Sequence, residues 1–243
     1  YKWFLNFFTD PYFGRLLKNT FLISGLTILF GFPAPIILAL MINEVKNSAF
    51  KRTVQTITYM PYFISMVVLC GLLKTFCMQD GLFAQIAVLF GGKAQNYLAN
   101  PAYFRTIYVL SDIWSGIGWN SIIYLAALSS IDQEQYEAAR VDGANRFEQM
   151  IHITLPGLVP TIMVLFILRM GNILNVGYEK ILLLYNSATY STADVISTYT
   201  YRLSFGGSGN PMYSKSTAIG LFNTIINVFF LMLTNMISKK ATD

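Results

Sequence analysis

The chain has 243 residues, of which 54% are hydrophobic and only 12% are charged, whereas soluble domains carry about 25% charged residues. This composition excludes an ordinary soluble domain and places the chain in a membrane. The net charge of +5 does not indicate nucleic acid binding, because the basic residues flank apolar runs instead of gathering on one face. Cys70 and Cys77 form no CxxC pair and predict neither a metal site nor a disulfide framework.

Residues 1–18 are rich in aromatic side chains and precede the first apolar run. Aromatic rings at this density favour the headgroup level of a bilayer, which predicts an external interfacial segment. Packing against neighbouring helices is the alternative. Because the chain begins with Tyr1 rather than Met and has no signal-peptide pattern, we expect an upstream segment to precede it.

Five apolar runs are long enough to cross a bilayer as helices. At about 1.5 Å per residue, roughly 20 residues span the hydrocarbon layer of a membrane. The runs cover residues 19–43, 53–73, 106–131, 156–176 and 216–238. The sequence therefore predicts an all-α fold, a polytopic transmembrane helical bundle in which residues 19–243 form one domain with about five spans.

Prolines interrupt two of these runs. Pro33 and Pro35 remove amide donors from the first run and predict a kink. Pro61 breaks the second run in the same way. Between the second and third runs, apolar residues within 82–90 recur at helical spacing, which predicts a short helix lying on the membrane surface or dipping into it.

Two charged residues lie inside the predicted spans. Arg169 is deep in the fourth run, where a guanidinium costs roughly 2.5 to 3.5 kcal/mol, so it has to face a wet cavity, pair with a carboxylate or lie nearer the interface. Asp112 is the acid available as a partner within the membrane, if the geometry permits. Since Asp112 lies near one end of its run, it has a second interpretation, in which it simply reaches interfacial water.

Positive residues fix the predicted orientation. If the spans alternate, the turn after the first run, the segment 132–155 and the C-terminus share one side of the membrane. That side holds, in short segments, Lys46, Lys51, Arg52, Arg140, Arg146, Lys239 and Lys240. The positive-inside rule therefore places 132–155 in the cytoplasm and Tyr1 outside, so the upstream segment is expected to contain a further span.

The polar segment 132–155 has its own helix-forming pattern. Asp132 and Gln135 have the spacing of a capping box and predict a helix start. Apolar or small residues then recur at intervals of three and four and predict one stripe, made of Tyr136, Ala139, Gly143, Phe147, Met150 and Ile151. From the residues alone, this stripe fits either a docking site for a partner or a surface helix folded against its own bundle.

A longer pattern in the same segment resembles a known family. Glu137-Ala138-Ala139 is followed by Asp142-Gly143-Ala144, Phe147, Ile153, Leu155-Pro156 and Pro160. This order and spacing resemble the EAA loop of binding-protein-dependent ABC importer permeases. Residues 30–35, 43–45, 111–114 and 182–186 are similar to the oligosaccharide and polysaccharide branch of that family. Gln133 departs from the pattern, since many relatives have proline there.

The resemblance implies a transport subunit of a bacterial cytoplasmic membrane, and not an enzyme. Segment 132–155 would form a coupling helix that docks into a cytoplasmic ABC ATPase dimer. The implied docking residues are Glu137 as polar anchor, Ala138 and Ala139 as the close-packed face and Gly143 as the turn, flanked by Asp142 and Ala144. Because the chain has no Gly-rich phosphate-binding loop with a lysine, ATP hydrolysis is expected on the partner, and neither a cofactor nor a metal is expected here.

Further partners are implied by the same resemblance. They are a second permease chain, related but different, and an extracytoplasmic solute-binding protein that residues 185–201 would meet. For carbohydrate cargo we expect aromatic faces and amide or hydroxyl groups near the bilayer midplane. The candidates are Trp119, Asn120, Tyr124, Asn172, Asn175 and Tyr178, each of which also fits helix packing. Asn172 and Asn175 are three residues apart and would share one helix face.

Two other classes of function compete with this interpretation. An ion-coupled secondary transporter would work without an ATPase and would use Asp112 and Arg169 as coupling charges. A membrane-embedded enzyme is disfavoured, because no Ser/His/Asp or metal-ligand cluster lies in an apolar run. The sole histidine, His152, lies in the polar segment, where we expect it to be a surface residue.

Overall fold

The computed structural model of the protein describes residues 1–206 and 211–242, with side chains described up to residue 239. All regular elements of these residues are helical, which confirms the predicted all-α fold. The helices are α1 (Lys2–Phe8), α2 (Phe13–Leu26), α3 (Pro33–Glu44), α4 (Ser48–Tyr59), α5 (Met66–Cys77), α6 (Leu82–Leu89), α7 (Pro101–Ser129), α8 (Gln133–Val141), α9 (Arg146–Gln149), α10 (Leu155–Met170), α11 (Tyr178–Leu184), α12 (Tyr190–Ala193), α13 (Ile196–Phe205) and α14 (Tyr213–Thr242). Short π-helical segments lie at Thr27–Gly31 and Met150–Thr154, and 3-10 turns lie at Met60–Phe63, Tyr97–Ala99 and Ser187–Thr189.

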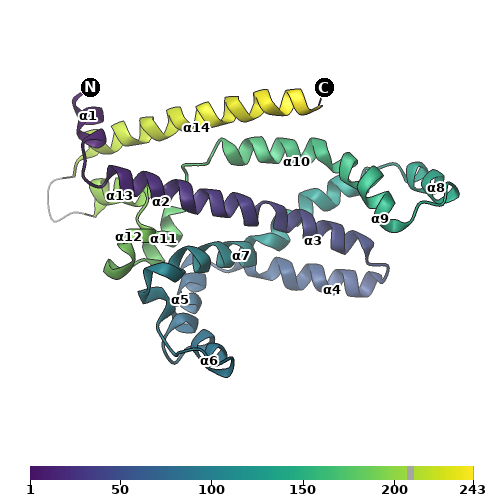
Figure 1. Ribbon diagram of the computed structural model, residues 1–243, viewed down its shortest axis with the longest axis horizontal. Helices are drawn as coiled ribbons and strands as arrows, with labels where there is room; N and C mark the ends of the chain where they lie inside the picture. Colours follow the sequence, from purple (N-terminus) through teal and green to yellow (C-terminus); the bar gives the residue numbers. More distant parts are fainter. Residues whose placement is uncertain (207–210, 243) are drawn as a thin grey trace.

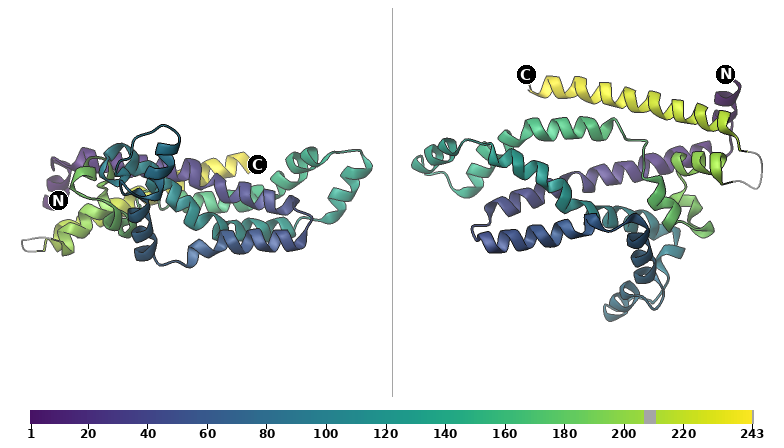
Figure 2. Two further views of the ribbon diagram at one scale, coloured as in Figure 1. Left: turned by 90° about the horizontal axis from the view of Figure 1, so that it is seen from below. Right: turned by 180° about the vertical axis from the view of Figure 1, so that it is seen from behind.

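The long helices run along the longest dimension of the molecule (Figure 1). α3 packs along α7, and α10 packs against both α7 and α14. α5 and α6 leave this bundle to one side, while α11, α12 and α13 gather at the end where the N-terminus lies (Figures 1 and 2). The largest apolar core joins residues of α5, α7 and α11 and contains Cys70 and Cys77, both of which are free thiols.

Four helical stretches are long and apolar enough to cross a membrane, namely Phe13–Glu44, Met66–Leu89, Arg146–Met170 and Tyr213–Lys239. Three of them contain the predicted first and fifth runs and most of the fourth. The third run lies in α7, whose 29 residues reach roughly 43 Å. α7 contributes polar side chains to a cavity of the bundle, among them Asp112 and Asn120.

The second predicted run forms two helices, and the proline within it predicted the break between them. α4 ends at Tyr59, and a 3-10 turn follows because Pro61 has no amide hydrogen with which to continue the α-helical pattern. Ser65 then caps α5 by accepting a hydrogen bond from the Val68 amide. The break expected at Pro61 is confirmed, but the apolar stretch is displaced to Met66–Leu89 and includes α6.

The irregularity expected at Pro33 and Pro35 lies one turn earlier. The π-helical segment Thr27–Gly31 joins α2 to α3, and α3 begins at Pro33, where a missing amide hydrogen costs no helical bond. The Phe32 amide still donates to the Ile28 carbonyl at 3.3 Å. The chain therefore stays helical from α2 through the π turn to α3, although Pro33 and Pro35 donate no backbone hydrogen bond.

Some aromatic side chains of the N-terminal segment pack against other helices, and others remain exposed. Phe7 is 1% exposed and meets Phe13 and Phe222 edge-on, which holds α1 against α14. Trp3 and Tyr12 remain exposed on the same segment. Helix packing therefore accounts for part of the aromatic content. The exposed rings remain available for contact with lipid headgroups or water.

A buried carboxylate ties the helices together at the end near the N-terminus. The Asp194 side chain is 1% exposed and accepts two hydrogen bonds of 2.8 Å from the Arg202 guanidinium. Arg15 of α2 lies 3.5 Å from the same carboxylate. Burial lowers the pKa of Arg202, but its hydrogen bonds to Asp194 outweigh burial and hold that pKa above its ordinary value. The bidentate pair fixes the start of α13, and the contact with Arg15 connects it to α2.

The opposite end of the bundle brings together the segments that the charge distribution assigns to one side. The α3–α4 turn, the α8–α9 hairpin and the C-terminus all lie there (Figure 1). Arg146 of α9 pairs with Glu44 at the end of α3, with 3.2 Å between Nη1 and Oε2. Both side chains are well exposed, so the pair contributes at most about 1 kcal/mol. The side chain of Lys240, one of the predicted basic residues, lies outside the described side chains.

We expect Gly118→Ala to destabilise the protein, because a Cβ at this position of α7 would clash with the backbone carbonyl of Thr58 and lie 2.8 Å from the Tyr59 amide nitrogen. Backbone atoms of a packed helix cannot yield, so the loss should be about 1 to 3 kcal/mol. Thermal unfolding of the purified full-length protein in its complex measures it. Gly25→Ala in α2, where no atom lies within 4 Å, is the matched control and should leave the unfolding temperature unchanged or raise it. An unchanged value for Gly118→Ala would contradict the described α4–α7 contact.

Candidate functional site

A polar cavity of about 450 Å³ lies between α3, α7 and α10. A second cavity of about 240 Å³ adjoins it and shares several lining residues: Thr27, Asp112, Arg169, Asn172 and Asn175. Asn120 and Tyr124 of α7 line the larger cavity, together with Pro35 of α3 and with Phe32, which directly precedes α3. The combined space is therefore enclosed by amides, aromatic rings and two charged groups.

The spacing of Asn172 and Asn175 predicted that they share a helix face, but the structure does not place them in a helix. α10 ends at Met170, and Asn172 and Asn175 lie in the irregular turn that follows. They nevertheless meet, because Nδ2 of Asn175 donates to Oδ1 of Asn172 at 3.1 Å. Asn172 in turn donates to the Leu168 carbonyl at 3.1 Å. Both amides are thus held at the cavity by their own hydrogen bonds.

This turn is fastened to α14. The Leu174 amide donates to Oδ1 of Asn227 at 3.0 Å in a buried position. Gly171 lies so close to Leu231 that a Cβ would come within 2.7 Å of its side chain. Ser24 of α2 also donates to the Ile173 carbonyl. The turn that carries the asparagines is therefore anchored on two sides.

Trp119 and Tyr178, the two other predicted cargo residues, do not line either cavity. The Trp119 ring stacks on Tyr62 with 4.6 Å between centroids and an interplanar angle of 4°. Tyr178 stacks on Tyr201 at 5.8 Å. One face of each ring is therefore covered by a neighbouring ring, while both side chains remain partly exposed.

Asp112 pairs with Lys180, and not with Arg169 as considered above. Nζ of Lys180 lies 3.4 Å from Oδ1 of Asp112, and the two side chains are 3% and 38% exposed. The same ammonium donates to the Tyr108 carbonyl at 3.1 Å and lies 4.6 Å from the centre of the Tyr108 ring. A lysine at this depth is thus compensated by a carboxylate, a carbonyl and an aromatic face.

Lys180 was not predicted to be a residue of the site, because the polar sequence that follows the fourth apolar run is typical of an external loop. α11 instead turns back into the bundle and buries Ile181 and Leu184 beside α5 and α7. The signal available in the sequence was the apolar run 181–184 directly after the lysine. A short helix of this kind has no span-like length, so hydropathy alone does not place it inside.

Arg169 occupies the last turn of α10 and lines both cavities. Among the described residues, its guanidinium has no ion pair and no hydrogen bond. Of the three predicted environments for this residue, the structure places it in the polar cavity. The site therefore contains one compensated charge pair and one cation without a described counter-ion.

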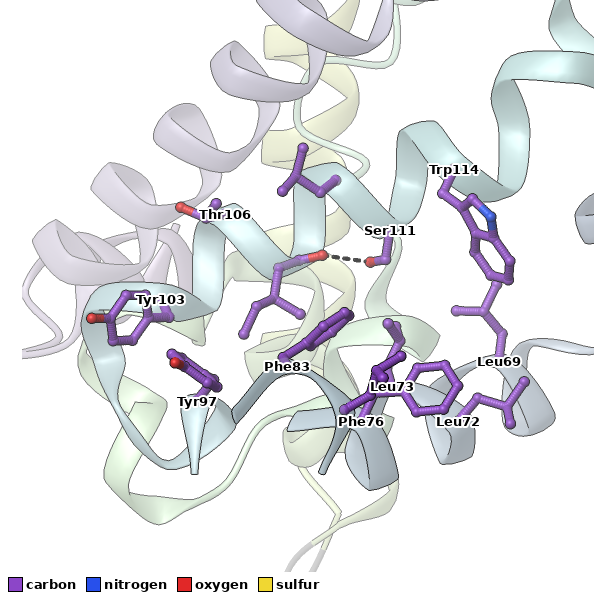
Figure 3. A pocket seen from close by; sticks show the side chains of 13 residues that line it. Leu69, Leu72, Leu73, Phe76, Phe83, Tyr97, Tyr103, Thr106, Ser111 and Trp114 are labelled. Atoms are coloured by element: carbon purple, nitrogen blue, oxygen red, sulfur yellow. Dashed lines mark hydrogen bonds between the residues drawn. The ribbon is translucent and has the colours of Figure 1, made fainter. Parts of the chain in front are cut away.

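A third hollow, of about 550 Å³, lies between α5, α6 and α7 but differs in chemistry (Figure 3). Its wall is made of leucines and aromatic rings, among them Phe76, Phe83 and Trp114. The Ser111 hydroxyl in this wall donates to the Ile107 carbonyl of its own helix at 2.6 Å, so it offers little to a polar ligand. The polar cavity next to Arg169 is therefore the better candidate for hydrophilic cargo.

The α8–α9 hairpin begins where the sequence predicts, but its capping box lies elsewhere. Asp132 caps α8 by accepting a hydrogen bond from the Glu134 amide, not from Gln135. A complete capping box forms at the second helix, where Asn145 and Glu148 exchange side-chain and backbone hydrogen bonds. The helix start at 133 is therefore supported by a single side-chain cap.

Gly143 makes the turn between α8 and α9. Its φ of +83° lies in the left-handed region, and a Cβ added at this residue would meet no atom within 4 Å. The same backbone conformation occurs in Gly91 (φ +79°), at the end of α6. The turn is thus specified by backbone conformation and not by crowding.

The hairpin leaves its apolar side chains uncovered. Phe147 is 65% exposed and Val141 is 87% exposed, while Glu137 and Ala138 are also exposed. Of the other implied docking residues, Asp142 and Gly143 are exposed, whereas Ala139 and Ala144 are half-buried. His152 is exposed and bonds to the Glu148 carbonyl at 3.0 Å. A surface helix folded on its own bundle would cover these groups, so the exposure favours the docking interpretation.

The hairpin is fastened to two helices that line the cavity. The Tyr136 hydroxyl lies 3.0 Å from the Thr154 hydroxyl, just before α10. Arg146 pairs with Glu44, the last residue of α3. A hollow of about 820 Å³ lies between the hairpin and the α3–α4 turn, bordered by Arg140 and Arg146. Movement of the hairpin is therefore able to reach α3 and α10 through direct contacts.

Residues 31–243 match the family of binding-protein-dependent transport system inner membrane components. The chain belongs to this family. It is 42% identical to Protein LplB of Bacillus subtilis (strain 168) over 241 residues, which are 99% of the chain and 75% of that protein. It is also 42% identical to the polygalacturonan/rhamnogalacturonan transport system permease YteP of the same organism over 240 residues, 98% of the chain and 74% of that protein.

Solved structures give the same result for the permease. A crystal structure of a bacterial ABC transporter involved in the import of the acidic polysaccharide alginate shares 45% identity and a TM-score of 0.95, covering 100% of this chain and 84% of that one. A second structure, with alginate pentasaccharide-bound periplasmic protein, gives 46% and 0.94, covering 99% and 83%. The predicted membership and the all-helical permease fold are confirmed.

This permease is a multi-pass inner membrane subunit of an ABC importer and not itself an ATPase. The family assignment replaces the ion-coupled carrier considered for Asp112 and Arg169. The geometry agrees, since Asp112 is compensated by Lys180 and does not meet Arg169.

Single and double replacements of the Asp112–Lys180 pair should differ in how much stability they remove. Asp112→Asn leaves the Lys180 ammonium, 3% exposed, without a counter-ion. We expect a loss of about 2 to 3 kcal/mol, below the range for fully buried pairs because Asp112 is partly exposed. Lys180→Met leaves a carboxylate that water reaches and should cost less. Thermal unfolding of the purified complex gives these values, and the double variant should recover part of the Asp112→Asn loss. Additive losses in the double variant would show that the two groups do not interact.

Proposed function

We propose that this permease carries oligosaccharides or polysaccharide chains across the membrane. The observation behind this proposal is the polar cavity, whose Asn120, Tyr124, Asn172 and Asn175 combine amide groups with an aromatic face. Sugars present hydroxyl rims and apolar ring faces, which such groups bind. The activities of the relatives support it, since they include polygalacturonan/rhamnogalacturonan transport and alginate import. Trp119 and Tyr178 join the path in this proposal only if their stacking partners release them.

The partners that we propose follow from the two ends of the bundle. A solute-binding protein would deliver cargo at the end formed by α11, α12 and α13, with residues 185–201 as its contact. The related alginate transporter, solved with a sugar-bound periplasmic protein, supports this assignment. In our proposal residues 1–18 lie at the outer interface and residues 19–243 form the transmembrane domain. A second, related permease chain completes the pathway.

At the other end, we propose that segment 132–155 is the coupling segment for a cytoplasmic ATPase dimer. Glu137 provides a polar anchor, Ala138 and Ala139 allow close approach, and Gly143 provides the turn, with Asp142 and Ala144 beside it. Exposed Phe147 and Val141 support the assignment, because a partner surface would remove them from water. ATP-driven closure of the ATPases would then displace the hairpin.

Displacement of the hairpin would reach the cavity by two routes. One runs through Tyr136 and Thr154 into α10, and the other through Arg146 and Glu44 into α3. Both helices contribute walls to the cavity, α3 with Pro35 and α10 with Arg169. A displacement of each helix at the end next to the hairpin would therefore change the width of the cavity at its other end.

The proposed function is tested by reconstitution. Lipid vesicles containing the full-length permease, its partner permease and the ATPase should take up labelled oligosaccharide when ATP is inside and the binding protein is outside. Omitting either ATP or the binding protein should abolish uptake. Uptake that instead follows an imposed proton or sodium gradient without the ATPase would overturn the proposal.

Gly143→Ala should uncouple ATP hydrolysis from uptake. Alanine in the left-handed region costs about 1 to 2 kcal/mol, so the α8–α9 turn should shift toward another backbone conformation. We expect at least a tenfold decrease in uptake per ATP hydrolysed in the reconstituted transporter.

Gly91→Ala is the matched control for this change. Gly91 has nearly the same φ and equally open surroundings but lies at the end of α6, away from the hairpin. The Gly91→Ala variant should have the same backbone strain, and its ratio of uptake to ATP hydrolysed should stay unchanged. Equal coupling ratios in both variants would refute the assignment of the turn to ATPase docking.

A further inference from the structure

We propose that the cargo of this permease carries carboxylate groups and that Arg169 binds one of them in the polar cavity. This inference rests on the proposed carbohydrate transport and specifies the chemical class of sugar. It is drawn from the position of Arg169, from the charges around it and from the neutral hydrogen-bonding groups that share its cavity.

Arg169 lies at a depth where a charge is costly. It is two residues before Gly171, which packs against Leu231, and Leu231 is near the middle of the membrane-spanning α14. A guanidinium at the centre of a span costs roughly 2.5 to 3.5 kcal/mol on insertion scales. An apolar residue would stabilise this position better, so a functional use of the charge is the default inference.

The charges of the cavity do not cancel. Its lining contains two ionised side chains, Asp112 and Arg169. Asp112 is already compensated by the Lys180 ammonium 3.4 Å away. Arg169 has no counter-ion among the described residues, so the site carries one uncompensated positive charge. A neutral sugar that displaced water from this space would leave that charge poorly solvated, whereas a carboxylate would neutralise it.

The geometry of the groups fits a sugar acid. A guanidinium binds a carboxylate through two parallel N–H donors, which fixes its orientation as well as its charge. The side-chain amide of Asn120 forms no hydrogen bond with the described residues, and Oδ1 of Asn175 likewise accepts none from them. These amides remain available for the ring hydroxyls beside the carboxylate. The related transporter described as importing the acidic polysaccharide alginate handles cargo of this class.

The test compares an acidic sugar with its neutral ester. Tetragalacturonate and its fully methyl-esterified form have the same length and differ in charge. Uptake of each is measured in vesicles with the complete transporter and saturating binding protein, and the ratio of acid to ester uptake is recorded for each permease variant. The same binding protein serves every variant, so its own preference cancels when ratios are compared.

Arg169→Gln should lower the acid-to-ester ratio at least tenfold relative to the wild type. Arg169→Lys keeps the charge but loses the paired donors, so its ratio should fall about threefold; it also provides the test if the glutamine variant does not assemble. Lys93→Gln removes an exposed positive charge from the loop after α6 and should leave the ratio unchanged.

An equal fall of acid and ester uptake in the Arg169 variants would overturn the proposal, since it would mean that Arg169 serves the fold alone. A wild-type transporter that carries the ester as well as the acid would overturn it too, while leaving carbohydrate transport intact. Uptake of neither sugar by the wild type, in an assembled complex that hydrolyses ATP, would instead refute the proposed function, and with it this inference.

Discussion

The interior of this permease depends on the compensation of a buried ammonium. Lys180 brings its charge to the junction of α7 and α11, where Asp112, the Tyr108 carbonyl and the Tyr108 ring surround it. Because an unpaired ion in this environment is costly, the three groups define how closely α11 approaches α7. The Asp112–Lys180 pair beside the cavity has no net charge. The charge and polarity of the cavity are therefore determined by Arg169 and the asparagine amides.

Local patterns predicted the helical architecture and the α8–α9 hairpin well, because caps, a turn glycine and helical periodicity act over a few residues. The helix start at Asp132 and the turn at Gly143 are of this kind. Lys180 and the asparagine turn were not predicted correctly. Their positions follow from contacts far apart in sequence, such as Leu174 with Asn227, which no local period encodes. The stacking of Trp119 on Tyr62 was likewise not predictable, since it joins residues far apart in sequence.

The cavity and the hairpin are connected through α3 and α10 in spite of their distance along the chain. α3 and α10 each have one end at the hairpin and side chains at the cavity. Short polar contacts make these connections, and exposed ion pairs add little to stability. Such contacts are suited to motion, because they keep the hairpin attached to α3 and α10 without fixing these helices in one conformation. The tightly packed parts, such as the Asp194 cluster near the N-terminus, lie at the other end.

The π-helical segment Thr27–Gly31 has a consequence for how this span is encoded. A π turn contains one residue more than an α turn, and one residue corresponds to about 100° of rotation around a helix axis. All side chains of α3 are therefore rotated relative to those of α2, which is how Thr27, Phe32 and Pro35 come to border the same cavity. If the same residues formed a regular α-helix, α3 would instead turn away from the cavity. The wider turn of this segment, and not only the identity of its residues, thus determines which side chains of α3 border the cavity.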